Sequence, residues 1–177
     1  MSKRDLKKYL SELDKEQLEE QIIELYEKFV PVKTFYDFVF NPKEDKLLQE
    51  SKTKISHEYF PVKKPNAKWR PKAKMRRSVA QKIIKHFILL GVDPFVIADL
   101  MLFNIEVAQT FSAGNYIKQE LFYKSILNSF EQAVNFVISN GILADFKTRI
   151  LEVHQQTLQQ KWKNKYDFEA ILEKIDL

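Results

Sequence analysis

The junction Leu90-Gly91-Val92-Asp93-Pro94 constrains the fold most strongly, because it ends one helix and begins the next with almost no loop. Gly91 lacks a Cβ and can adopt the left-handed conformation that closes a helix. Asp93 can accept a hydrogen bond from a free amide of the following helix, and Pro94 stands where a missing N–H costs nothing. Such a short connection predicts that successive helices are antiparallel neighbours.

The segment from Phe95 to Phe111 is apolar around most of its helical circumference. A helix of this kind has to be packed on more than one side, so we expect it at the centre of a bundle. Asn104 points into the apolar arc and is predicted to be buried and hydrogen-bonded. At about 100° per residue, the other polar side chains share one narrow stripe: Asp99, Glu106, Gln109 and Thr110.

Composition excludes several classes of protein. With 177 residues, 45% of them hydrophobic and 30% charged, the chain has ordinary globular values and is long enough to bury a core. It has no cysteine, which excludes disulfides, thiolate metal sites and cysteine nucleophiles. The N-terminus leads into an amphipathic helix, and charged residues interrupt the apolar region 83–111. We therefore expect a soluble cytoplasmic protein without a membrane span.

The predicted fold is all-α: an irregular antiparallel bundle of about seven to eight helices in one domain over residues 1–177. N-terminal helices occupy 1–60, a basic connector 61–77, and central and C-terminal helices 78–177. The segment Lys33–Phe40 is compatible with a strand, but no partner strand is predicted, so we expect a short helix. Gly91, Gly114 and Gly141 each follow an apolar helical run and are predicted to end a helix, which leaves no glycine for a phosphate-binding loop.

Three parts of the sequence form a recognisable combination: the opening residues 2–10 (Ser-Lys-Arg-Asp-Leu-Lys-Lys-Tyr-Leu), the Phe35-Tyr36-Asp37-Phe38 block and the helices 79–111. Together they resemble a family of uncharacterised bacterial proteins catalogued as a domain of unknown function. The resemblance implies a helical bacterial cytoplasmic protein. It implies no activity, and no functional residue is carried over from it.

Asp99 and Glu106 lie two helical turns apart on one face of the central helix. A carboxylate pair there could bind a metal or act in acid–base chemistry, which is the third functional alternative. The Glu-x-x-His signature of di-metal bundles is absent from the sequence. The favoured alternative is therefore a narrow polar stripe paired with Lys or Arg from a neighbouring helix, with no catalytic, metal or cofactor site.

Three histidines, His57, His86 and His154, fall on three different predicted helices. They could converge on a zinc ion, but none has metal-ligand spacing to another His or acid. We therefore interpret them as surface or boundary side chains.

The segment from Pro61 to Arg77 is the one break in composition. It carries eight cations and no acid. Because the whole chain has a net charge of +5, the rest of the chain has a net charge of −3. The segment is predicted to be extended, because three prolines interrupt it. The residues predicted to bind a polyanion are Lys63, Lys64, Lys68, Trp69, Arg70, Lys72, Lys74, Arg76 and Arg77.

Two arrangements of this segment are open. It could stand free, with Trp69 stacking on an unpaired base while the cations hold phosphates. It could instead lie across an acidic face of its own bundle, with Trp69 tucked onto the helices as an anchor. The sequence thus predicts a non-catalytic interaction module with an unknown protein partner. A nucleic-acid-associated protein using 61–77 is the alternative, and Lys or Arg from the folded helices extending the segment into one face would favour it.

Overall fold

The computed structural model describes residues 2–63, 65–69 and 71–173. Within them it contains nine α-helices and no strand. The all-α prediction is thus confirmed, and the described residues form slightly more helices than the seven to eight that were predicted. The chain divides into two compact units, Met1–Lys43 and Glu44–Leu177, here called the N-terminal and C-terminal units. The sequence predicted one domain with its first subdivision at residue 60. The boundary lies earlier because the helix that follows Lys43 buries Ile55 and Tyr59 within the larger unit.

The N-terminal unit contains α1 (Lys3–Ser11), α2 (Lys15–Lys28) and α3 (Val30–Phe40). Each of the first two begins with a reciprocal capping box: Ser2 with Asp5, and Asp14 with Gln17. The segment that was compatible with a strand is helical, but α3 begins three residues earlier than predicted. Pro31 lies in the first turn of α3, where proline is tolerated.

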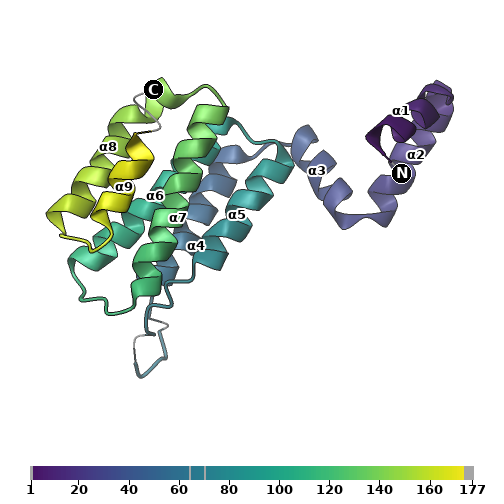
Figure 1. Cartoon of the computed structure of the whole chain (residues 1–177). Helices are drawn as coiled ribbons and strands as arrows, with labels where there is room; N and C mark the ends of the chain where they lie inside the picture. The colour runs from purple at the N-terminus through teal and green to yellow at the C-terminus, as the bar shows by residue number, and fades with distance from the viewer. Residues whose placement is uncertain (1, 64, 70, 174–177) are drawn as a thin grey trace. The chain divides into compact units, whose positions relative to one another are not determined.

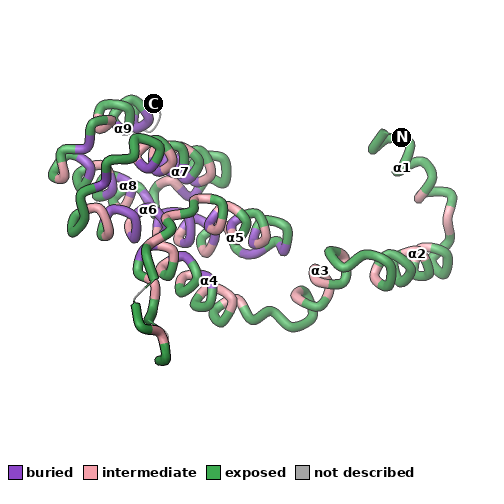
Figure 2. Tube along the Cα trace, turned by 90° about the horizontal axis from the view of Figure 1, so that it is seen from below, coloured by how far each residue is buried: buried purple, intermediate pink, exposed green. Residues whose placement is uncertain are grey.

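No described residue of the N-terminal unit is buried, and Figure 2 shows its trace in pink and green only. Its side chains contact one another at the surface. The Tyr26 hydroxyl donates to the Asp37 carboxylate at 2.8 Å, and the Tyr26 and Tyr36 ring centroids are 6.5 Å apart. These contacts join α2 to α3 without excluding water from either helix.

The C-terminal unit packs five helices around or beside a central one (Figure 1). They are α4 (Glu44–Tyr59), α5 (Arg77–Leu90), α6 (Pro94–Ala113), α7 (Glu120–Ser139), α8 (Leu143–Gln159) and α9 (Lys165–Leu172). The central helix is α6, as predicted, and it contacts α4, α5, α7 and α8. By length and composition α6 could cross a membrane, but half of its most apolar window is buried inside this unit. Packing on several sides accounts for its apolar character.

The glycines divide into two kinds. Gly91 closes α5 with φ of 68°, and Gly141 follows α7 with φ of 69°, so both adopt the left-handed conformation that glycine favours. Gly114 also ends its helix, α6, but with φ of −99°. Gly114 therefore does not adopt the left-handed conformation, and a side chain there meets no strain.

Two polar residues of α6 lie inside the core. Asn104 is 2% exposed, so its predicted burial is confirmed. Gln109, which the helical spacing placed on the polar stripe, is 3% exposed instead. Its side-chain amide donates to the Val153 carbonyl at 2.7 Å, and this bond to α8 allows the amide to be buried.

Candidate functional site

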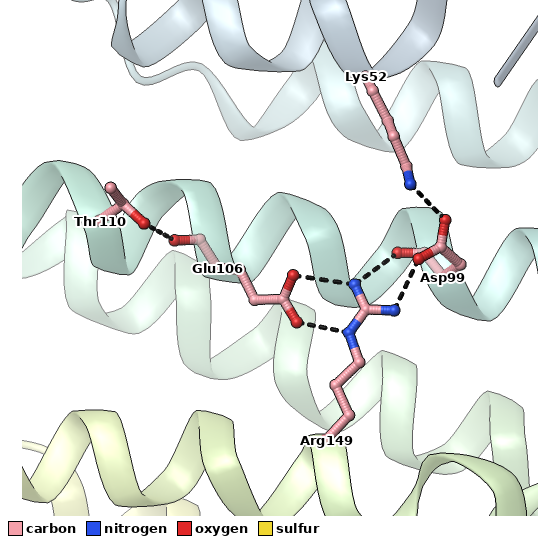
Figure 3. A network of polar contacts seen from close by, with 5 residues as sticks. All are labelled: Lys52, Asp99, Glu106, Thr110 and Arg149. Atoms are coloured by element: carbon pink, nitrogen blue, oxygen red, sulfur yellow. Dashed lines mark hydrogen bonds and ion pairs between the residues drawn. The ribbon is translucent and has the colours of Figure 1, made fainter. Parts of the chain in front are cut away.

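The two carboxylates of the α6 stripe share one guanidinium group (Figure 3). Arg149 reaches them from α8. Its Nε and Nη2 donate to the two carboxylate oxygens of Glu106 at 2.5 and 2.9 Å, while Nη1 donates to Asp99 Oδ1 at 2.6 Å. The planar donor array of arginine can bind both acids at once, which the point charge of lysine cannot do.

A second cation completes the cluster from the opposite side. Lys52 on α4 places its ammonium 2.6 Å from Asp99 Oδ2 and 5.1 Å from the Phe103 ring centroid. Asp99 therefore joins α4 to α6, while Arg149 joins α6 to α8. Between 23% and 35% of each of the four side chains remains exposed, so the cluster lies at the edge of the core.

The charges shift each other's titration. Burial by itself raises the pKa of Asp99, but hydrogen bonds from Lys52 and Arg149 outweigh it and hold that pKa below its ordinary 3.8. Burial likewise opposes the charge on Arg149, and its hydrogen bonds with Glu106 and Asp99 still raise its pKa. Asp99 and Arg149 are thus stabilised in their charged forms, and a lowered carboxyl pKa is the opposite of what a general acid near neutral pH needs.

The cluster matches the interpretation as a polar stripe paired with neighbouring cations. The carboxylate oxygens that a metal or substrate would need already accept hydrogen bonds from Lys52 and Arg149. Throughout the described residues, no group of three His, Asp or Glu side chains could hold a metal ion. The sequence suggested a Lys or Arg partner but could not identify it, because Arg149 is 43 residues beyond Glu106.

The basic segment leaves the C-terminal unit between α4 and α5 (Figures 1 and 2). Lys64 and Arg70 lie outside the described residues. The side chain of Trp69 is not an anchor, because 77% of the residue is exposed and the Lys68 ammonium lies 5.9 Å from its ring centroid. Four lysines of the segment are exposed and form no salt bridge with any described residue: Lys63, Lys68, Lys72 and Lys74.

Two of the predicted binding residues have structural partners instead. The Arg76 guanidinium binds both carboxylate oxygens of Glu58, at 2.9 and 2.7 Å, and this bond lowers the pKa of Glu58. The half-buried Arg77 donates from Nε to the Ser129 hydroxyl at 3.2 Å. These arginines fix the end of the segment to α4 and α7. Within its described residues, the segment is thus tied to the helices at its C-terminal end, and its acidic partner there is Glu58.

Two further connections lie at the same end of the C-terminal unit as this segment (Figure 1). Side-chain contacts join these connections to the neighbouring helix ends. The Phe60 and Phe111 ring centroids are 5.6 Å apart, and the Ser112 hydroxyl donates to the Gln160 side-chain oxygen at 2.5 Å. The Asn164 side chain donates to the Tyr123 carbonyl at 3.2 Å. Residues 60–76, 114–119 and 160–164 together contain ten Lys and Arg residues and no Asp or Glu. We call these three connections the lysine-rich end.

The sequence alone did not reveal this convergence. Lys118, Lys161 and Lys163 were not among the predicted binding residues, because they are far from 61–77 in the chain. In the structure they line one pocket of about 590 Å³ between the two shorter connections. Tyr116, 88% exposed, and the buried Trp162 contribute aromatic surface to it. The signal that could have found these lysines is the absence of acids from both connections.

Comparison with known proteins identifies a family but no activity. The chain matches the model of DUF6155, a family of unknown function, over residues 1–176, and it belongs to that family. No curated protein and no solved structure matches it.

Proposed function

We propose that this chain is a non-catalytic module that binds single-stranded nucleic acid through its lysine-rich end. The observation that carries the proposal is the convergence of three acid-free connections at one end of the C-terminal unit. The connections at residues 91–93 and 140–142 contain no Lys or Arg. Positive charge is therefore concentrated where the chain turns at the lysine-rich end, as electrostatic binding of a phosphate backbone requires.

Exposed aromatic rings favour a single strand over a duplex. Trp69 and Tyr116 are 77% and 88% exposed, so the faces of both rings are open to a ligand. Unpaired bases offer faces on which such rings stack, whereas the bases of a duplex are already stacked on one another. The four exposed lysines of the segment, Lys63, Lys68, Lys72 and Lys74, can hold the phosphates on either side.

The first test measures affinity against salt. Protein freed of copurified nucleic acid is titrated into labelled single-stranded DNA and RNA, with fluorescence anisotropy as the readout. We expect weak binding without sequence preference, and a log–log salt slope of about 0.7 for each phosphate contact. Absence of binding to single strands at low salt would sink the proposal.

Two lysine variants of equal charge separate the site from net charge. The site variant replaces Lys63, Lys68, Lys72 and Lys74 by Gln, and the control variant replaces the exposed Lys46, Lys54, Lys82 and Lys85 by Gln. The site variant should bind more weakly with a flatter salt slope, while the control should keep most of its slope. Equal losses in the two variants would mean that only overall charge matters.

The aromatic contribution is tested at Trp69. Trp69→Ala should weaken binding about tenfold, the equivalent of stacking one base, and leave the salt slope unchanged because stacking releases no counterions. Trp69→Phe should retain part of the affinity. Unchanged affinity in Trp69→Ala would remove stacking from the proposal.

A further inference from the structure

The N-terminal unit is too small and too open to be stabilised by its own core. It has 43 residues, none of those described is buried, and α1 is only nine residues long. Units of this size usually need a disulfide, a metal or an oligomer, and isolated helices of this length are marginal in water. The chain has no cysteine, and its described residues contain no metal-ligand group. Burial of these helices therefore has to come from outside the unit.

The first two helices carry opposite charge. In α1, four cations and one acid give a net charge of +3; in α2, two cations and five acids give −3. The two lysines of α2 pair with glutamates of the same helix, Lys15 with Glu19 and Lys28 with Glu24. The α1 cations form no salt bridge with any described residue. Most of the complementary charge is therefore unused within one chain.

Apolar surface accompanies this charge on both helices. Leu6 and Tyr9 of α1 are 44% and 46% exposed, and Ile23 of α2 is 58% exposed. A groove of about 590 Å³ runs along α2. The end of α1 and the turn after it contribute apolar side chains to its lining, and α2 contributes a row of acids. The residues of the groove that matter here are Tyr9, Leu13, Glu20, Ile23, Glu24 and Glu27.

We infer that the N-terminal unit is a self-association element, in which α1 of a second copy occupies the acidic groove on α2. The occupant that fits an acid-lined apolar groove is a short, basic, amphipathic helix, and α1 has this charge and pattern. In a two-fold dimer the exchange is reciprocal, so each +3 helix meets a −3 helix and both apolar faces lose water. This inference does not depend on nucleic-acid binding.

The first experiment is sedimentation equilibrium on the full-length chain. We expect a monomer–dimer equilibrium, because a charged interface formed by two short helices gives modest affinity, with Kd of about 10 µM. Ile23→Glu should shift the equilibrium to monomer. Leu151→Glu, a matched substitution at a 44% exposed leucine of α8, should not. A wild-type chain that stays monomeric at about 100 µM would overturn the inference.

Charge exchange tests the pairing itself. One variant reverses α1 (Lys3, Lys7 and Lys8→Glu), and the other reverses the groove (Glu20, Glu24 and Glu27→Lys). Each alone should be monomeric, because each places like charges against each other in a homodimer. An equimolar mixture should dimerise, since both helix pairs are then complementary. Packing of α1 on α2 within one chain would not produce this rescue, so a monomeric mixture, or variants that dimerise alone, would refute the exchange.

Discussion

Replacement of Arg149 by Met should be the most destabilising change of a charged side chain in the C-terminal unit. It removes both guanidinium bonds to Glu106 and the bond to the Asp99 side chain, and leaves Glu106 without its cation. Methionine keeps much of the aliphatic volume, so the loss is mainly electrostatic.

The magnitude follows from burial. Breaking a fully buried ion pair costs about 3–5 kcal/mol, whereas an exposed pair is worth about 0–1 kcal/mol. Arg149 is 27% exposed and its two acids are 28% and 35% exposed, so water partly solvates the acids after the change. Lys52 also remains beside Asp99. We expect a loss of about 2 kcal/mol in the free energy of unfolding. Arg149→Lys should lose about half of that, because lysine keeps the positive charge but not the planar array of donors.

Urea denaturation followed by tryptophan fluorescence measures this change. In a Trp69→Phe background the signal comes from Trp162, which is 4% exposed in the C-terminal unit, so the N-terminal unit does not contribute. The matched control is Lys46→Met, which removes a pair with Glu50 at 3.9 Å between side chains 73% and 52% exposed. It should cost less than about 0.5 kcal/mol. If Arg149→Met costs no more than this control, the cluster is not a structural tie between helices.

Four further substitutions are measured by the same denaturation assay. The pKa of Asp99 is lowered in the folded state, so its contribution to the free energy of unfolding is complete above the ordinary pKa of 3.8 and disappears as the pH falls through the lower pKa of the folded state. Asp99→Asn should therefore reduce the free energy of unfolding at neutral pH and reduce it less in acid. Asn104→Asp should cost about 3 kcal/mol at neutral pH, since the residue is 2% exposed, and an unchanged midpoint would contradict the packing of α6. Gly141→Ala should cost about 1 kcal/mol because φ is 69°, whereas Gly114→Ala, at φ of −99° with open space for a Cβ, should be neutral or slightly stabilising; equal effects would contradict the cap assignment.

Local features were predictable from the sequence because they depend on neighbours a few residues away. The left-handed Gly91 and the central place of α6 follow from φ freedom and helical periodicity. The burial of Asn104 follows from the same periodicity. A helical period fixes which side of a helix a residue occupies, so these predictions needed no knowledge of other helices.

Helix packing decided what lies opposite each of these faces. The spacing placed Gln109 beside Asp99 and Glu106, but α8 covers that part of α6, and the Val153 carbonyl allows the amide to be buried. The identity of Arg149 as the shared partner, the gathering of three acid-free connections at one end, and the division after Lys43 are also long-range outcomes. Periodicity gives a direction around a helix axis, and only the packed structure determines which side chain, or which water, lies in that direction.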